Sequence, residues 1–168
     1  PMADGSTLAT DIVAPPGDAA APAVLIRTPY GRGAHLREAI EWARRGFCAC
    51  VQDVRGRYES DGDWRPYRGE REDGSATLDW LADHSWCDGR VAVSGGSYAA
   101  FTAWSAAVTG HPAVVAVMSA VPAMGQSVNW HGEALNLLHH VVWWTDHGDA
   151  RVSRGSLSDA MLALDPAI

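Results

Sequence analysis

Short runs of consecutive apolar residues alternate with segments of helical spacing over most of the chain. Residues 7–13 alternate loosely between apolar and polar positions after a turn signal at Asp4-Gly5, which is typical of a strand. Continuous apolar runs of strand length predict buried strands. These runs lie at residues 23–28, 47–51, 91–94 and 114–118.

Helices are expected between these strands. In residues 34–45 the apolar side chains recur at helical spacing, and Gly46 suits the position just after a helix end. Strands with apolar residues at consecutive positions are typical of a parallel sheet covered on both faces. With right-handed crossovers, the alternation predicts a doubly wound α/β core with a mostly parallel sheet. Further helices are expected at residues 75–83 and 101–108, and a long polar loop at 54–74.

The character of the chain changes after Met118. Trp and His residues crowd a segment that is expected to be helical from about residue 133 to 145, and a second amphipathic helix is expected near residue 156. This pattern indicates helical material inserted after a strand. The expected division is the N-terminal part of an α/β core, residues 1–124, and the beginning of a helical cap domain, residues 125–168.

Charge and composition narrow the classes of partner. The formal net charge of −7 over 168 residues argues against nucleic acid or an anionic membrane as the main partner. No apolar run reaches the length of a membrane span, and no signal peptide is visible, so a cytoplasmic location is expected. Because the chain starts at Pro1 rather than Met, its N-terminus is expected to be trimmed or incomplete.

The three cysteines lack the spacing of a disulfide framework or a metal site. Cys48 and Cys50 would share one face of a strand, where they are interpreted as small buried hydrophobic residues. No metal and no organic cofactor is expected.

The most informative segment is R-V-A-V-S-G-G-S-Y-A-A at residues 90–100. An apolar strand runs through a Gly-Gly-Ser turn directly into a helix, which is the context of a nucleophile elbow of the α/β-hydrolase type. Small residues must flank the serine, and Gly95 and Ala99 meet this need. Ser97 is the candidate nucleophile, because its hydroxyl would be exposed on a sharp turn beside a helix N-terminus. The alternative is an ordinary helix N-cap serine.

A second hydrogen-bond donor for an oxyanion would come from the loop after the preceding buried strand. That loop is T-P-Y-G-R-G at residues 28–33. Tyr30 offers a phenolic hydroxyl there. From position alone, Tyr30 is equally well explained as a packing residue.

Several segments together resemble the cocaine esterase / X-prolyl dipeptidyl-peptidase-like hydrolase family. Each segment is weakly specific alone, but they occur in order and at matching spacing over most of the chain. They are M-A-D-G-S-T-L-A-T-D at 2–11, R-T-P-Y at 27–30, Q-D-V-R-G-R at 52–57, S-x-G at 60–62, P-Y at 66–67, Glu70, D-G at 73–74, D-W-L at 79–81, W-C-D-G-R-V at 86–91 and G-G-S-Y at 95–98.

The resemblance implies that Ser97 is the nucleophile and that the Tyr98 backbone N–H and the Tyr30 hydroxyl form the oxyanion hole. It also implies that Trp130 and residues near Leu138 line the acyl pocket, with ordinary packing within the cap as the alternative. The family usually has glycine where this chain has Ala100, which suggests a more crowded elbow.

A triad of this fold runs Ser, then Asp or Glu, then His, and the acid and the histidine follow later strands. This chain leaves no room for those strands after residue 118, so we expect a missing C-terminal part or a second polypeptide to supply both groups. The sequence then predicts a serine hydrolase that cleaves a small-molecule ester or amide through an acyl-serine intermediate. The alternatives are an acyltransferase that delivers the acyl group to an amine or alcohol, and a non-catalytic protein of the hydrolase fold.

Overall fold

The computed structural model describes residues 1–121, 130–131, 134–135, 137–148 and 151–152. Side chains are described for residues 1–121, 141–148 and 151–152. The chain divides into two compact units, residues 1–123 and 124–168. We describe each unit by itself.

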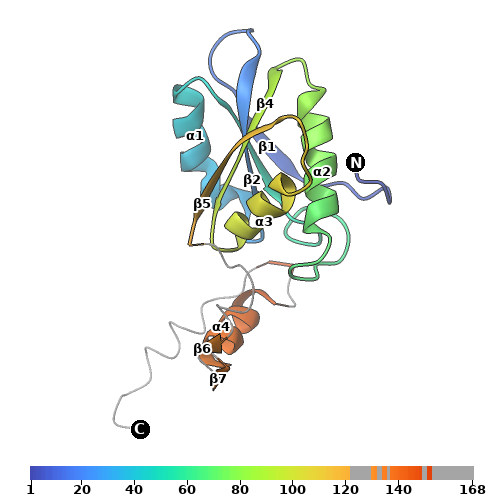
Figure 1. Ribbon diagram of the computed structural model, residues 1–168, viewed down its shortest axis with the longest axis vertical. Coiled ribbons are helices and arrows are strands. Elements are labelled where there is room, and N and C mark those ends of the chain that lie inside the picture. Colours follow the sequence, from blue (N-terminus) through green and yellow to red (C-terminus); the bar gives the residue numbers. More distant parts are fainter. Residues whose placement is uncertain (122–129, 132–133, 136, 149–150, 153–168) are drawn as a thin grey trace. The chain divides into compact units, whose positions relative to one another are not determined.

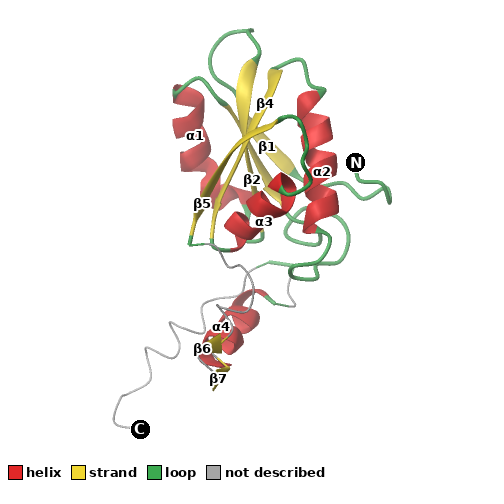
Figure 2. Ribbon diagram, in the orientation of Figure 1, coloured by secondary structure: helices red, strands yellow, loops and turns green. Residues whose placement is uncertain are grey.

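A five-stranded mixed sheet forms the centre of the first unit (Figure 2). The strand order is β1-β3-β2-β4-β5, with β1 antiparallel to β3 and every other pair parallel. The doubly wound, mostly parallel core expected from the sequence is therefore confirmed. The strands are β1 (Thr10–Val13), β2 (Ala21–Thr28), β3 (Cys48–Asp53), β4 (Cys87–Gly96) and β5 (Val114–Ala120).

Helices cover both faces of this sheet (Figure 1). Because side chains alternate along a strand, Leu25 of β2 packs with α2 and α3, whereas Val24 and Ile26 pack with α1 on the opposite face. Gly46 adopts a φ of 86° after α1, as its predicted position at a helix end requires. The helices are a 3₁₀ turn, η1 (Arg32–His35), followed by α1 (Leu36–Arg44), α2 (Glu70–Ala82) and α3 (Tyr98–Ala107).

The free cysteines lie in the core between the sheet and α2. Cys48 and Cys50 point to the same face of β3, where they join one apolar cluster with Leu78 and Leu81. The interpretation of these two cysteines as small buried hydrophobic residues is confirmed.

Helix α2 begins at Glu70, so the prediction of a loop as far as residue 74 is wrong. Three acidic residues occupy its first turn, where negative charge is favourable near the positive end of the helix dipole. Glu70 and Asp73 are buried there because they pair with arginines from distant segments. The charged residues at 70–73 made the segment look like a loop in the sequence, although it is the start of a helix.

Strand β5 was expected to be buried, and within the described residues it is an edge strand. It pairs with β4 on one side, and Val115 on its outer part is 60% exposed. A run of apolar residues cannot distinguish an edge from a central position, because that depends on which strand lies beside it.

The second unit contains a short antiparallel hairpin, β6 (Trp130–His131) with β7 (Ala134–Leu135), followed by α4 (Leu137–His147). The helix expected from residue 133 thus begins later, after the hairpin. The helix expected near residue 156 lies outside the described residues. That this unit begins a helical cap stays a prediction. No helix in the described part of the chain has the length and apolar character to cross a membrane.

Leu81 tests the packing of α2 on the sheet. We expect Leu81→Ala to lower the free energy of unfolding by about 3 kcal/mol, because the fully buried side chain leaves a cavity when truncated. Urea denaturation measures the change. Leu36→Ala is the matched control, since Leu36 is 51% exposed and its truncation should cost less than about 1 kcal/mol. Equal losses in the two variants would contradict the packing described.

Candidate active site

Ser97 is the single residue between the end of β4 and the start of α3. Its backbone has φ 54° and ψ −122°, a combination that residues with a side chain rarely adopt. Strained residues of this kind persist where the surrounding structure fixes them, and they concentrate at functional sites. In a parallel α/β sheet, ligands bind outside the carboxyl ends of the strands, which is where Ser97 lies.

Close packing between β4 and α3 explains the small residues around Ser97. An added Cβ at Gly95 would lie 2.3 Å from the carbonyl carbon of Ala99, far inside van der Waals contact. Ala99 and Ala100 are both buried, so the methyl group of Ala100 is accommodated where the family usually has glycine. The turn is therefore possible only because the residues packed around Ser97 have small side chains or none.

The Ser97 side chain does not act as an ordinary N-cap. Its hydroxyl makes no capping hydrogen bond to α3. Instead Ser97 Oγ lies 3.3 Å from the hydroxyl of Tyr30. Tyr30 follows β2 and Ser97 follows β4. Because β2 and β4 are parallel neighbours, their carboxyl ends lie side by side and bring the hydroxyl groups of Tyr30 and Ser97 together. The first N–H groups of a helix point out of its N-terminal end, and Tyr98 is the first residue of α3.

The backbone around Tyr30 is fixed from several sides. The Tyr30 N–H donates to Thr28 Oγ1 at 3.1 Å, and the Tyr30 carbonyl accepts a hydrogen bond from the Tyr58 hydroxyl at 2.9 Å. Arg57 is fully buried and donates through Nε to the Pro29 carbonyl at 2.9 Å. Arg57 belongs to the Q-D-V-R-G-R segment of the family resemblance, but no role was predicted for it or for Tyr58, because both lie in a stretch expected to be a loop.

A ring of Trp64 supports Arg57. The guanidinium carbon lies 4.4 Å from the Trp64 ring centroid, within the range of a cation–π interaction. Burial lowers the pKa of Arg57, partly offset by the neighbouring Tyr58 and Asp53. The segment after β3 thus supports the backbone of the Tyr30 loop through Arg57 and Tyr58.

The Tyr98 side chain is completely buried beneath the turn. Its hydroxyl donates to Glu70 Oε1 at 2.9 Å and accepts the Tyr67 backbone N–H at 2.7 Å. Its ring packs among aromatic neighbours, with centroid distances of 4.9 Å to Tyr67 and 5.7 Å to Phe101. Burial, followed by the nearby Glu70 charge, raises the pKa of Tyr98, so its hydroxyl is a neutral donor.

Buried charges link this tyrosine to the centre of the sheet. Arg27 of β2 is 1% exposed and pairs with Glu70 Oε2 at 3.1 Å. Arg55 holds Asp73 through two contacts, at 2.7 and 3.0 Å. Burial raises the pKa of Glu70, while Arg27 and the Tyr98 hydroxyl act in the opposite direction. Glu70 and Asp73 therefore each have a cationic partner, as buried charges require.

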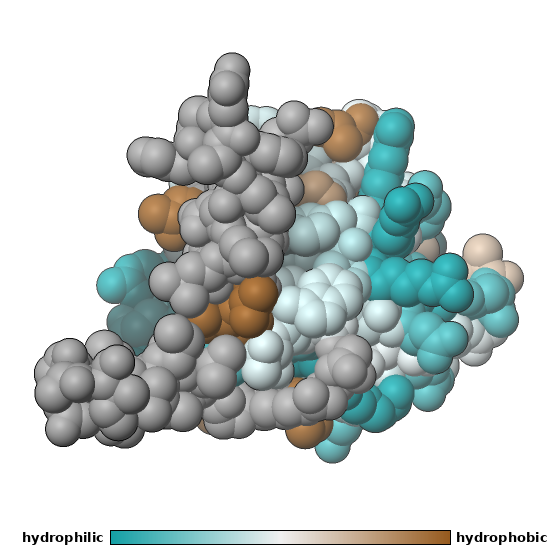
Figure 3. Space-filling model, turned by 90° about the horizontal axis from the view of Figure 1, so that it is seen from below, coloured by the Kyte–Doolittle hydropathy of each residue, from teal (hydrophilic) through white to brown (hydrophobic). Residues whose placement is uncertain are grey.

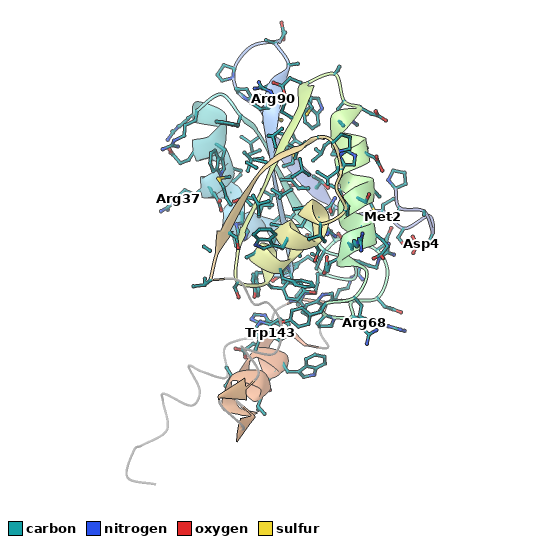
Figure 4. The ribbon with its side chains drawn as sticks, in the orientation of Figure 1. Met2, Asp4, Arg37, Arg68, Arg90 and Trp143 are labelled. Atoms are coloured by element: carbon teal, nitrogen blue, oxygen red, sulfur yellow. The ribbon has the colours of Figure 1, made fainter. Side chains whose placement is uncertain are left out.

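The first unit presents two distinct ends. Arg68, just before α2, and Arg90, near the start of β4, lie at opposite ends of the sheet (Figure 4). Ser97 belongs to the end at which β4 finishes. Seen from that side, residues of intermediate hydropathy lie next to a rim of hydrophilic residues (Figure 3).

The comparison with protein families gives a match over nearly the whole chain. Residues 4–162 match the family model described as X-Pro dipeptidyl-peptidase (S15 family). The chain belongs to this family. The resemblance inferred from the sequence segments is thereby confirmed.

Individual relatives of this S15-family chain include esterases and a peptidase. Cocaine esterase of Rhodococcus sp. (strain MB1 Bresler) is 36% identical over 116 residues, which cover 66% of this chain and 20% of that protein. A solved α-amino acid ester hydrolase matches with a TM-score of 0.81 and 29% identity, covering 93% of this chain and 30% of that one. A solved aminopeptidase from the marine sediment archaeon Thaumarchaeota archaeon matches with a TM-score of 0.79 and 27% identity, covering 93% of this chain and 30% of that one. The chain thus spans 20–30% of the length of these relatives.

The three histidines in residues 1–121 of this S15-family chain all have partners other than Ser97. His35 contacts Glu38 at 3.1 Å, and His84 contacts the Trp80 carbonyl at 2.8 Å. His111 pairs with Asp79 at 3.1 Å, but it precedes β5 and so lies at the amino end of the sheet. Within residues 1–121, the structure therefore brings Ser97 and Tyr30 together without a histidine.

Two sequence-predicted site residues belong to the second unit. Trp130 lies in β6 and Leu138 in α4, and both fall outside the residues whose side chains the structure describes. Their role in lining an acyl pocket stays a prediction.

Gly95 tests the close approach of β4 and α3. We expect Gly95→Ala to lower the free energy of unfolding by about 2 kcal/mol or more, because the added methyl group overlaps the Ala99 backbone. Gly96→Ala is the control, since its Cβ would meet only the Ala120 carbonyl oxygen at 3.8 Å. Thermal unfolding compares the two. If Gly95→Ala lowered the free energy of unfolding less than Gly96→Ala does, the turn would not be packed as described.

Proposed function

We propose that this chain carries the nucleophile half of a serine hydrolase that cleaves esters or amides through an acyl-serine intermediate. The observation that carries the proposal is the 3.3 Å contact between Ser97 Oγ and the Tyr30 hydroxyl, at a strained turn between β4 and α3. Two hydroxyl groups at this position can serve as the attacking nucleophile and as a donor to the developing oxyanion.

The chemistry follows from these positions. Ser97 Oγ attacks the carbonyl carbon and transfers its proton to a histidine base, while the carbonyl oxygen gains negative charge. The Tyr30 hydroxyl and the Tyr98 backbone N–H donate hydrogen bonds to that oxygen. Collapse of the tetrahedral intermediate expels the alcohol or amine, which receives the proton from the histidine. Water then attacks the acyl-serine in the same way and releases the carboxylic acid.

We propose further that the histidine and its acidic partner lie outside the first unit of this chain. A serine without an adjacent base is a weak nucleophile at neutral pH. The three histidines in residues 1–121 have other partners, and the relatives are much longer than this chain. The base and the acid would come from the remainder of the protein or from a second polypeptide, which together with this chain we call the assembled enzyme.

An ester or amide carbonyl is the substrate group shared by the related proteins. One is named a cocaine esterase, one an α-amino acid ester hydrolase and one an aminopeptidase. The strained backbone at Ser97 favours a catalytic protein over a non-catalytic one, because strain is costly to keep without a function.

A fluorophosphonate probe tests the nucleophile. We expect the assembled enzyme to form a covalent adduct at Ser97, found by intact mass and peptide mapping, because the probe reacts only with an activated serine. Ser97→Ala should remain unlabelled. An unlabelled Ser97 in the folded, assembled enzyme would overturn the proposal.

Tyr30 tests the oxyanion hole. We expect Tyr30→Phe to lower kcat for an aryl ester by about 10²–10³-fold, as for other single oxyanion-hole donors. The change should appear in kcat more than in KM, since the hydrogen bond strengthens in the transition state. Steady-state kinetics of the folded variant measure both. A raised KM with an unchanged kcat would assign Tyr30 to substrate binding instead.

A further inference from the structure

We propose that Glu70 and the Tyr98 side chain act as a positioning pair that fixes the backbone N–H of residue 98 beside Ser97. This inference rests on the proposed function, because it assigns a role to the groups behind the oxyanion hole. It concerns the buried phenol of Tyr98, which contacts Glu70 and Tyr67. The backbone N–H of Tyr98 is the group that the proposed function assigns to the oxyanion hole.

The geometry ties the first residue of α3 to a second helix. The Tyr98 hydroxyl donates to Glu70 Oε1 at 2.9 Å, and Glu70 is the first residue of α2. The same hydroxyl accepts the Tyr67 N–H at 2.7 Å, from the segment just before α2. A helix start ordinarily frays, because its first groups lack partners within the helix. Here the side chain of that first residue is held at both its donor and its acceptor positions.

Packing alone does not require the hydroxyl. The ring of Tyr98 lies among Tyr67, Phe101 and Trp64, where a phenylalanine would fill the same space. A buried hydroxyl without partners would destabilise the fold, and Glu70 and the Tyr67 N–H are partners of this one. Tyr67 has a φ of 65°, so the segment that supplies this donor is itself held in an uncommon conformation.

Glu70 can act as a fixed point because it is held in turn. It is 4% exposed, and Arg27 contacts both its carboxylate and its backbone, at 3.1 Å to Oε2 and 2.9 Å to the carbonyl oxygen. Arg27 lies on β2, the central strand of the sheet. Through Glu70, the side chain of Tyr98 is thereby connected to the central strand of the sheet. Small displacements of reacting groups cost large factors in rate, so this connection matters for the position of the N–H of residue 98.

Tyr98→Phe in the assembled enzyme tests the pair. This variant keeps the ring and the backbone N–H of residue 98 and removes only the hydroxyl. We expect kcat for a p-nitrophenyl ester and the rate constant of fluorophosphonate labelling to fall about tenfold, less than for a donor that is removed entirely. KM should change by less than about twofold, because ground-state binding is not affected.

Two substitutions of Glu70 form a matched pair. Glu70→Gln keeps a carbonyl oxygen that can accept the Tyr98 hydroxyl, whereas Glu70→Met has similar length and no such acceptor. Both remove the charge opposite Arg27, so that loss cancels in the comparison. We expect kcat of Glu70→Met to be at least as low as that of Tyr98→Phe, because Glu70→Met also removes the charge opposite Arg27. Glu70→Gln should have a higher kcat than Glu70→Met. The double variant Tyr98→Phe/Glu70→Met should show no loss beyond that of Glu70→Met.

Leu81→Ala controls for lost stability alone. Leu81 is fully buried on the same helix, and its apolar side chain belongs to the cluster that contains Leu78 and Cys50. This variant should lower the melting temperature and leave kcat unchanged.

The outcomes separate this inference from the function on which it rests. Labelling of the wild-type enzyme at Ser97, and not of Ser97→Ala, upholds the proposed function whatever the Tyr98 and Glu70 variants do. The inference is then overturned if folded Tyr98→Phe reacts at the wild-type rate, or if Glu70→Met equals Glu70→Gln. Failure of both Tyr98→Phe and Glu70→Met to fold would also overturn it, since the contact would then serve stability. If the wild-type enzyme is unlabelled, both proposals fail together.

Discussion

At the carboxyl end of β4, a strand and a helix approach so closely that a single methyl group cannot be inserted between them. A Cβ on Gly95 would lie 2.3 Å from the Ala99 backbone. This approach leaves one residue for the whole reversal from strand to helix, and Ser97 takes a positive φ to complete it. The strained backbone of Ser97, its half-buried hydroxyl beside Tyr30 and the helix N-terminus behind it all follow from this steric constraint.

The two tyrosines around Ser97 depend on the same stretch of chain. The segment between β3 and α2 supplies Arg57 and Tyr58, which hold the backbone at Tyr30, and Tyr67, which holds the side chain of Tyr98. Glu70 continues this support at the start of α2. A stretch with little regular structure therefore determines the geometry on both sides of the serine.

The parts of the fold that the sequence predicted are those set by local pattern. The apolar run of β4 followed by Gly95, Gly96 and Ser97 indicated the elbow, because only small residues and a strand–turn–helix context permit such a turn. The contact between Tyr30 and Ser97 depends on β2 and β4 being neighbours. The position of Tyr30 in the chain did not distinguish a packing residue from a hydrogen-bond donor. The family resemblance favoured the donor.

Long-range pairing explains what the sequence did not predict. The start of α2 looked like a loop because Glu70 and Asp73 are charged, and their burial is intelligible only with Arg27 and Arg55 opposite them. The exposure of β5 depends in the same way on which strands lie next to it. Neither the arginine opposite each carboxylate nor the strand beside β5 can be identified from spacing along a single sequence.

The pairing of Arg27 with Glu70 also limits how this protein can vary. Arg27 lies on β2 and Glu70 on α2, and removing one member of a buried ion pair costs far more than replacing both. Single substitutions at either position are therefore poor evolutionary intermediates, and the two positions should co-vary among homologues. A chimaera joined between α1 and α2 would retain a sound core only if both parents carry the same pair.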